Sequence, residues 1–293
     1  MSTIFPLRFR RLPDSSLVFA NESGQFFKSN DGFLGRLDTD DLTDDDTHFL
    51  EDRAMAFRKP GDLNETAFLH KLASRMKIPS DLSYVILVPT LRCDLACSYC
   101  QVSRAALNAK GFDWSEETLA QVLSYLDVSA KRSIQVEFQG GEPTLRPDLI
   151  SAVIDFCRDR FDESQFIICT NLSNLSPELL EIISEDDVFV STSLDGTKAT
   201  HQSQRTSTSS QTDQFFSNFE KVGDLIGDRL SALPTLNSTN LPKPSDFLDA
   251  FSNFGMRSIF LRPVVYHGFA RKRHPNSRNY QKDWEQFYEA CVL

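Results

Sequence analysis

The chain has 293 residues, of which 40% are hydrophobic and 25% charged, and its formal net charge is −10. It is long enough for one large domain, or for a large and a small one. The acidic balance argues against nucleic-acid and anionic-membrane partners, because proteins that bind these concentrate Lys and Arg. No apolar run approaches the roughly 20 residues needed to cross a bilayer, and residues 1–12 lack the apolar segment of a signal peptide. We therefore expect a cytoplasmic protein whose six cysteines are metal ligands or buried small residues.

Residues 1–80 predict a small α+β segment. Short runs of alternating apolar residues over 7–12, 16–21 and 25–29 are separated by DSS and NESG turns, as in an antiparallel sheet. The acidic stretch 38–52 is typical of a solvated face or a helix start, and a partner-binding surface is the alternative. A helical pattern follows near 65–76.

From residue 84 onward, strand-like runs alternate with helical patterns. The expected strands are YVILVPT, IQVEFQ, FIICT, VFVSTSLD, LSALPTLN and IFLRPVV, at 84–90, 134–139, 166–170, 188–195, 230–237 and 259–265. Each is followed by an expected helix, near 115–126, 148–160, 177–184, 213–226, 244–254 and 284–293. The stretch SQRTSTSSQTD, 203–213, predicts a polar loop.

This alternation predicts an α/β fold with a parallel sheet over 81–293. Eight βα units close a full barrel, so six predict a partial, TIM-like (β/α)6 barrel. In such a fold, the working residues lie at the C-terminal ends of the strands and in the loops that follow them.

Three cysteines, Cys93, Cys97 and Cys100, occur within eight residues just after the first expected strand. Three thiolates can hold three irons of a [4Fe–4S] cluster, which leaves the fourth iron open for a substrate or cofactor. A structural zinc ion is the alternative, but it needs a fourth ligand. Cys157, Cys169, Cys291 and the histidines do not offer one at a suitable spacing.

The spacing Cys-x3-Cys-x2-Cys, with Tyr99 before the last cysteine, resembles the signature of the radical S-adenosylmethionine (SAM) superfamily. The resemblance implies that the open iron binds the amino and carboxylate groups of SAM. It also implies that the reduced cluster cleaves SAM to a 5′-deoxyadenosyl radical, which abstracts a hydrogen atom. The cofactor supplies this chemistry, and the protein orients it and excludes water. No catalytic residue is assigned beyond the three cluster ligands.

Further motifs follow the next strands in the order that the resemblance implies. Gly140, Gly141 and Glu142 end the second expected strand, as in the family's GGEP segment, which engages the SAM amino group; a plain Gly-Gly turn is the alternative. Polar residues follow later strands and correspond to residues beside SAM in the family, although they are also common in turns and helix caps: Asn171, Ser193 and Asp195. Arg205 resembles the arginine that pairs with the SAM carboxylate. Tyr99 would border the adenine, and Leu261 either packs on that ring or belongs to the core.

The segments CSYCQVSR, VEFQGGEPTL, TNLSNLSPELL and SIFLRPVVYHGFA are similar to the HxsB family of maturases in the His-Xaa-Ser system. This resemblance implies a ribosomally made peptide or protein substrate, of the His-Xaa-Ser repeat type. It also implies an electron donor such as flavodoxin or ferredoxin, and by analogy a peptide-recognition role for residues 1–80. That family continues into a C-terminal segment, which is cysteine-rich in related maturases. This sequence stops at Leu293, so we expect the auxiliary-cluster region to be absent.

Two other functions stay open. A sulfatase-type maturase would oxidise a Cys or Ser of a protein, and it needs a carboxylate base and auxiliary clusters that the sequence does not show convincingly. A non-catalytic, truncated accessory protein would only bind the peptide. Tyr266, His267 and the basic run ARKRH, 270–274, follow the last expected strand, where a peptide could approach; a solvated loop is the alternative.

Overall fold

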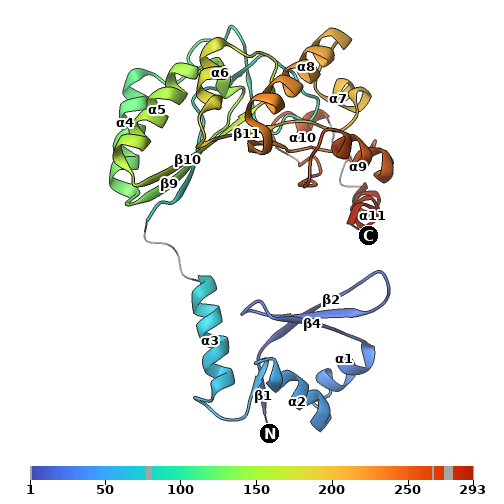
Figure 1. Ribbon diagram of the computed structural model, residues 1–293. Coiled ribbons are helices and arrows are strands. Elements are labelled where there is room, and N and C mark those ends of the chain that lie inside the picture. The colour runs from blue at the N-terminus through green and yellow to red at the C-terminus, as the bar shows by residue number, and fades with distance from the viewer. Residues whose placement is uncertain (1, 77–80, 266, 274–279, 293) are drawn as a thin grey trace. The chain divides into compact units, whose positions relative to one another are not determined.

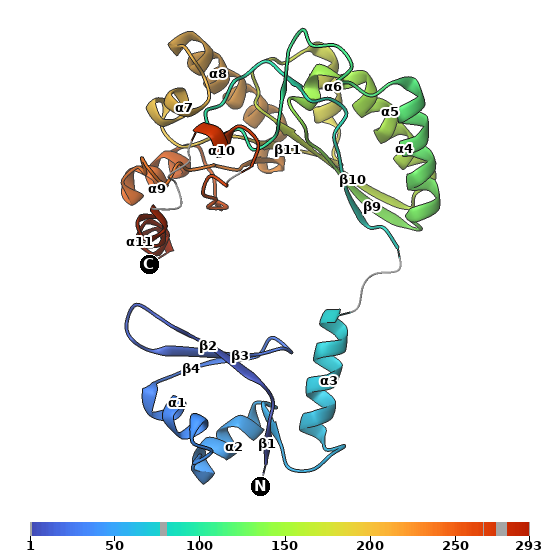
Figure 2. The same cartoon turned by 180° about the vertical axis from the view of Figure 1, so that it is seen from behind.

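The structure, a computed structural model, describes residues 2–76, 81–265, 267–273 and 280–292. The chain divides into two compact units, Met1–Ser80 and Asp81–Leu293. Each unit has its own sheet and its own helices (Figures 1 and 2). None of the helices in the described ranges is both long and apolar enough to span a bilayer.

The first unit contains a three-stranded antiparallel sheet in the order β2–β3–β4, formed by Leu7–Arg11, Leu17–Asn21 and Phe26–Ser29. In the same unit, β1 (Thr3–Ile4) and β5 (Ala56–Phe57) form a short antiparallel pair. Its helices are α1 (Asp31–Asp38), α2 (Asp44–Asp52) and α3 (Leu63–Met76). The central strand alternates buried and half-buried residues, so that Leu17 and Phe19 enter the core with Phe27 and Phe33 from its neighbours.

The acidic stretch of this unit is a helix start. Thr43 caps α2 by accepting a hydrogen bond from the Asp46 backbone N–H at 3.1 Å, while the Asp46 carboxylate accepts one from the Thr43 backbone N–H at 3.0 Å. This capping box satisfies two N–H groups that no helical carbonyl can reach. The acidic residues of the first turn also face the positive end of the helix dipole.

The second unit is built on a five-stranded parallel sheet in the order β12–β11–β10–β9–β6. Its strands are β6 (Tyr84–Leu87), β9 (Ser133–Phe138), β10 (Glu163–Thr170), β11 (Val188–Thr192) and β12 (Leu230–Ala232). Helices α4 (Glu116–Ser129), α5 (Pro147–Arg160), α6 (Pro177–Ser184) and α8 (Ser209–Ile226) connect successive strands and cover one face of the curved sheet (Figures 1 and 2). The expected α/β, partial TIM-like architecture is confirmed.

The two faces of the parallel sheet have different roles. Val136, Phe166, Ile168 and Val190 are fully buried against the covering helices, where they form the main core. The residues between them point to the opposite face and are only half-buried, and Cys169 of β10 is one of these. Because side chains alternate along a strand, a sheet covered by helices on one face presents a second row of side chains to the barrel interior.

The expected sixth strand, 259–265, is not a regular strand. It is an extended segment joined to the chain after β12 by a single parallel bridge between Leu236 and Pro263. The backbone N–H of Leu236 donates to Arg262 O and that of Val264 donates to Leu236 O, each at 2.9 Å. Pro234, two residues before Leu236, has no backbone N–H to donate to this segment, so the ladder does not extend toward β12.

The polar stretch 203–213 is not a loop over most of its length. Helix α7 (Lys198–Gln204) enters it, and α8 begins at Ser209 after Thr208, whose side chain accepts a hydrogen bond from the Gln211 N–H at 3.2 Å. Ser and Thr are common in loops, but they are also preferred helix caps, and here capping decided the structure. After α9 (Pro244–Asn253), the last helices are α10 (Ala270–Arg273) and α11 (Gln281–Val292).

Candidate active site

A pocket lies at the C-terminal ends of the parallel strands, where the fold places working residues. Ten of the eleven site residues expected from the sequence line it: Cys93, Cys97, Tyr99, Cys100, Gly140, Gly141, Glu142, Asn171, Ser193 and Arg205. The eleventh, Asp195, is fully buried behind the wall and accepts hydrogen bonds from three of the lining residues. Leu261 is not among the lining residues and packs against the main core, as the second of its two interpretations predicted.

The cysteine loop is anchored at both ends. The short strands β7 (Arg92–Cys93) and β8 (Ala105–Ala106) pair in parallel and close it. The Arg92 guanidinium donates to both carboxylate oxygens of Asp113, each at 2.7 Å, which fixes the residue just before Cys93. At the far end, the Cys100 thiol donates to Val102 O at 3.0 Å.

The thiols are partly buried, and in the described ranges no three His, Cys, Asp or Glu side chains surround a single point as ligands of one metal ion would. Burial raises the pKa of the Cys93 thiol to about 12 and also raises that of Cys97. Both are therefore thiols at neutral pH, and a metal would have to displace their protons.

The Gly-Gly-Glu turn packs on the chain's own backbone. The Gly141 N–H donates to Thr90 O at 3.0 Å, and the Glu142 N–H donates to Arg92 O at 2.8 Å. A Cβ added to Gly141 would lie 2.2 Å from Arg92 O, and one added to Gly140 would lie 2.3 Å from Thr90 O. The two glycines thus allow the turn to approach the strand that enters the cysteine loop.

Glu142 and Asn171 connect this turn to the cysteines. The buried Glu142 carboxylate accepts hydrogen bonds from the Thr144 hydroxyl at 2.6 Å and the Asn171 backbone N–H at 2.8 Å. Burial raises the pKa of this carboxyl to about 7, although these bonds oppose the shift. The Asn171 amide donates to Asp94 Oδ1 at 2.8 Å and lies 3.8 Å from Cys93 Sγ.

Asp195 organises the opposite part of the wall. Its carboxylate accepts hydrogen bonds from the Tyr99 hydroxyl, from Arg205 Nε at 2.9 Å and from the Thr235 N–H at 3.0 Å. Arg205 also stacks over the Tyr99 ring, 5.1 Å from its centroid, and its Nη1 lies 3.9 Å from Cys97 Sγ. Burial by itself would lower the pKa of Arg205, but the charge of Asp195 raises it overall. The guanidinium is therefore a permanent positive charge beside the cysteines.

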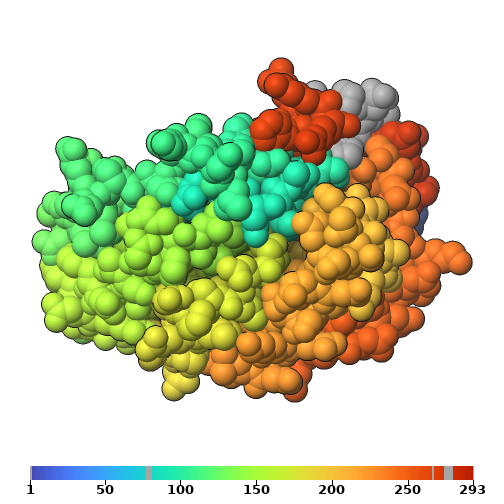
Figure 3. Space-filling model, turned by 90° about the horizontal axis from the view of Figure 1, so that it is seen from above, coloured from blue at the N-terminus to red at the C-terminus, as the bar shows by residue number. Residues whose placement is uncertain are grey.

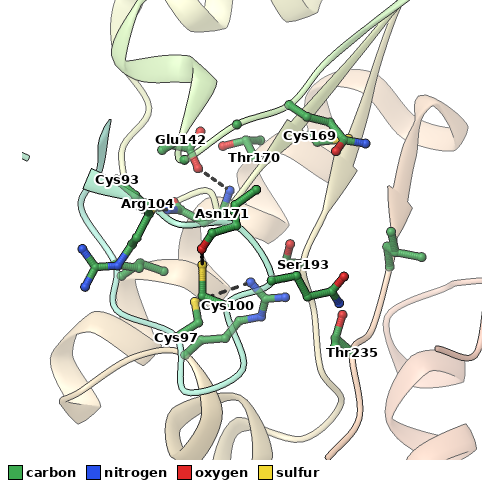
Figure 4. A pocket seen from close by; sticks show the side chains of 18 of the residues that line it. Cys93, Cys97, Cys100, Arg104, Glu142, Cys169, Thr170, Asn171, Ser193 and Thr235 are labelled. Carbon is green, nitrogen blue, oxygen red and sulfur yellow. Dashed lines mark hydrogen bonds between the residues drawn. The ribbon is translucent and has the colours of Figure 1, made fainter. Parts of the chain in front are cut away.

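Several lining residues were not anticipated as site residues, and three of them carry polar groups at the far side of the pocket: Cys169, Thr235 and Arg262. Figure 4 shows Cys169 and Thr235 on the side of the pocket away from Cys97 and Cys100. Cys169 Sγ lies 3.1 Å from Glu137 Oε1. Cys169 stands near the C-terminal end of β10, and this position in the sequence could have identified it as a site residue. Thr235 and Arg262 lie within the expected fifth and sixth strands, so the strand-end rule pointed to neither; only the observed end of β12 at Ala232 places Thr235 after a strand.

The expected substrate-side residues fall in different places. Tyr266 and His274 lie outside the described residues, and His267 is exposed. The basic run forms helix α10 over 270–273 instead of a loop; its three basic residues are exposed, and the helix rests on the cysteine loop (Figure 3). The Ala270 N–H donates to Cys100 O at 3.0 Å, and Arg273 Nη1 donates to Ala96 O at 3.2 Å and Cys97 O at 3.3 Å.

Solved structures share this fold. The structure of anSMEcpe with bound AdoMet superposes with a TM-score of 0.52 at 19% identity and covers 63% of this chain and 52% of its own. The structure of Streptococcus suis SuiB bound to the precursor peptide SuiA gives a TM-score of 0.50 at 14% identity and covers 99% of this chain and 71% of its own.

Sequence relatives match more locally. The uncharacterized protein MJ0907 of Methanocaldococcus jannaschii is 32% identical over 117 residues, which are 39% of this chain and 39% of that protein. An uncharacterized protein of Methanothermobacter thermautotrophicus is 27% identical over 192 residues, 62% of this chain and 68% of its own. The chain thus spans well under half of the length of the first relative. The family model described as the radical SAM superfamily matches residues 87–243. This range includes the cysteine loop and four of the five strands of the parallel sheet, β9 to β12. The chain belongs to the radical SAM superfamily.

Proposed function

We propose that this chain cleaves SAM reductively at a [4Fe–4S] cluster held by Cys93, Cys97 and Cys100, in order to modify a ribosomally made peptide or protein. The observation that carries the proposal is the gathering of these three thiols in one pocket with Glu142 and Arg205. When bound, the cluster and SAM supply a one-electron cleavage that yields a 5′-deoxyadenosyl radical.

The donor set fits that cofactor. Thiolates are the ligands that iron–sulfur clusters take, and each thiolate of a cluster binds its own iron. The cysteines of a cluster therefore do not converge on one point, in keeping with the lack of a single-ion arrangement among the described residues. The loop is held from several sides, by Asp113 through Arg92, by α10 and by the Gly-Gly-Glu turn.

We assign the SAM-binding side to the residues that line the cysteine half of the pocket. Glu142 has a pKa of about 7, so an ammonium group beside it would favour the ionised carboxylate. Arg205, held by Asp195, offers its remaining donors to a carboxylate, and Ser193 lies on the same wall. Tyr99 is fixed by its hydrogen bond to Asp195. The backbone at Gly140 and the amide of Asn171 complete this side.

The substrate that we propose is a peptide of the His-Xaa-Ser repeat type, on the resemblance to the HxsB maturases. Among the solved structures of the same fold, SuiB is bound to a precursor peptide and anSMEcpe has been solved with the Cp18Cys peptide. We also propose that the first unit, 1–80, recognises the peptide, because its sheet has β2 and β4 as edge strands. A flavodoxin or ferredoxin would supply the electron.

A sulfatase-type oxidation is the second candidate, and one observation favours it. Glu137 lies on the inner face of the sheet, and its Oε1 is 3.1 Å from Sγ of the pocket-lining Cys169, which makes it the carboxylate to test as a base. The Tyr84 hydroxyl and the Gln139 amide also donate to this carboxylate. A non-catalytic, peptide-binding accessory role is the third candidate.

Anaerobic reconstitution with iron and sulfide tests the proposal. We expect a brown protein that, once reduced, converts SAM to 5′-deoxyadenosine. Offering a His-Xaa-Ser repeat peptide and, separately, a sulfatase-type Cys or Ser peptide then distinguishes the first two candidates by which one changes mass. A protein that holds iron and binds peptide without cleaving SAM would indicate the accessory role. A colourless protein that retains one zinc ion per chain would disprove the cluster assignment.

A further inference from the structure

Arg262 is a pocket residue whose position is well defined by its surroundings. Its Nη2 donates to the Thr235 hydroxyl at 2.9 Å, and its backbone carbonyl accepts the Leu236 N–H at 2.9 Å. Thr235 in turn donates its backbone N–H to Asp195 at 3.0 Å. The guanidinium is therefore tied, through Thr235, to the network that also orients Tyr99 and Arg205.

The charge of Arg262 is not matched within the described part of the chain. Its Nε is buried and has no hydrogen-bond partner there, and no ion pair joins Arg262 to a described carboxylate. Asp195, the nearest network carboxylate, already accepts from Tyr99, Arg205 and Thr235. Burial, followed by the like charge of Arg205, lowers the pKa of Arg262.

Two other arginines at the pocket differ in this respect, since Arg92 pairs with Asp113 and Arg205 pairs with Asp195. Arg104, which also lines the pocket, has no ion pair among the described residues either, but its guanidinium lies over the Phe269 ring, 5.9 Å from the centroid. A half-buried guanidinium without a counter-charge is costly, because it has lost water without gaining a partner. A bound carboxylate would offset that cost, since its two oxygens match the planar donors of arginine.

Arg205 and Arg262, two of the arginines that line the pocket, face different neighbours. Arg205 is the one in contact with Cys97, on the side that we assign to SAM. Arg262 extends from the segment after the last strand and is bonded to Thr235, which lies with Cys169 on the side away from Cys97 and Cys100 (Figure 4). Ser191 of β11 and Leu233, which directly follows β12, also line the pocket.

We infer that Arg262 is a carboxylate-binding residue on the substrate side of the pocket, so that the substrate presents an anionic group there. This inference rests on the proposed function, because only that function makes the molecule bound at Arg262 a substrate. Two sources of a peptide carboxylate fit, an Asp or Glu side chain and a free C-terminus. The carboxylate of SAM is a third source, and its binding by Arg262 would contradict the inference.

The test uses the full chain after anaerobic reconstitution, with and without saturating SAM. The probes are N-acetyl-glutamate N-methylamide for a side-chain carboxylate and N-acetyl-alanine for a C-terminal one. Their neutral partners are N-acetyl-glutamine N-methylamide and N-acetyl-alanine N-methylamide. Dissociation constants are measured by ligand-observed NMR with probe concentrations up to about 50 mM, because single-group ligands bind in the millimolar range. SAM affinity and 5′-deoxyadenosine formation are measured on the same preparations.

We expect at least one carboxylate probe to bind about tenfold more tightly than its neutral partner, as a charged hydrogen bond allows. Arg262→Gln should remove that preference and leave SAM affinity within about twofold, and Arg262→Lys should restore part of it. Thr235→Val keeps the charge but removes the bond that orients it, so it should weaken the preference without abolishing it. Arg104→Gln is the matched control, because Arg104 is another cation that lines the pocket.

Three results would overturn the inference: equal binding of both members of each probe pair by the unmodified chain, an equal loss in Arg104→Gln, or SAM binding weakened about tenfold by Arg262→Gln. Failure of the proposed function appears separately. If the chain does not cleave SAM but keeps an Arg262-dependent preference for the carboxylate probes, only the proposed function is disproved. If it cleaves SAM without that preference, only this inference is disproved.

Discussion

Replacing Gly141 by Ala tests how closely the Gly-Gly-Glu turn must approach the cysteine loop. A Cβ at this position would lie 2.2 Å from Arg92 O and 2.5 Å from Leu91 O, whereas real contacts of this kind stay beyond 3.0 Å. Both neighbours are backbone atoms, so no side chain can rotate away. The φ of Gly141 is not in the left-handed region, which leaves the steric overlap as the cause of any effect.

The size of the effect follows from the geometry. The Arg92 carbonyl must retreat by at least 0.8 Å to restore a 3.0 Å contact, and it is the acceptor of the Glu142 N–H. Overpacking of this kind costs about 1–3 kcal/mol, and a weakened hydrogen bond adds about 1 kcal/mol. We therefore expect the free energy of unfolding to fall by about 2–4 kcal/mol, which is roughly 5–15 °C in Tm for a unit of this size.

The displacement also moves the residue next to Cys93. A shift of this size in a positioning segment can cost about a hundredfold in rate. We expect Gly141→Ala to retain less iron after reconstitution and to form 5′-deoxyadenosine far more slowly. Gly223→Ala is the matched control, because Gly223 lies inside α8 and a Cβ there meets only Leu230 Cδ2 at 3.7 Å.

Calorimetry, iron content and SAM cleavage are measured on the three proteins together. The thermal measurement does not depend on the cofactor assignment, so it tests the packing argument alone. If Gly141→Ala unfolded at the temperature of the unmodified chain and held as much iron, the steric reasoning would be refuted. Gly223→Ala should be neutral or slightly stabilising, since alanine favours a helix over glycine by roughly 0.5–1 kcal/mol.

Two further predictions concern the cysteines and a buried histidine. Changing any of the three loop cysteines to Ser should abolish iron binding and SAM cleavage, whereas Cys169→Ser, in the same pocket, should retain its iron; equal iron loss in that control would mean that a fourth thiol is a ligand. His201 is fully buried against Phe215, and burial lowers its pKa to about 3. Because the unfolded state binds a proton near pH 6.5 and the folded state does not, stability falls as the pH drops from 6.5 toward 3. By pH 4.5 this linkage is worth about 2–3 kcal/mol. His201→Phe should reduce the acid sensitivity seen in urea unfolding at pH 7 and 4.5, while His267→Phe, at an exposed position, should not; identical losses in both variants would exclude His201 as the cause.

Much of the fold was accessible from the sequence, because it rests on local patterns. The strands that became β9, β10 and β11 were visible as apolar runs, and α6 has the expected bounds, Pro177–Ser184. Burial periodicity is a property of neighbouring residues, so it survives without tertiary information. The predictions of a sixth strand and of a loop over 203–213 were wrong because another local effect prevailed in each segment. In the first, a proline lacks the N–H that a strand ladder needs, and in the second, Ser and Thr cap a helix.

The order of the motifs by itself determined which residues meet in the pocket. Cysteines, Gly-Gly-Glu, Asn171, Ser193 and Arg205 each follow a strand, and the C-terminal ends of parallel strands meet at one edge of the sheet. Only the tertiary structure decided what each residue touches. It showed that the two glycines approach Thr90 and Arg92, and that Arg205 is already paired with Asp195. It also showed that Arg262 has no counter-charge among the described residues, because charge balance in a pocket depends on segments far apart in the chain, which no local pattern records.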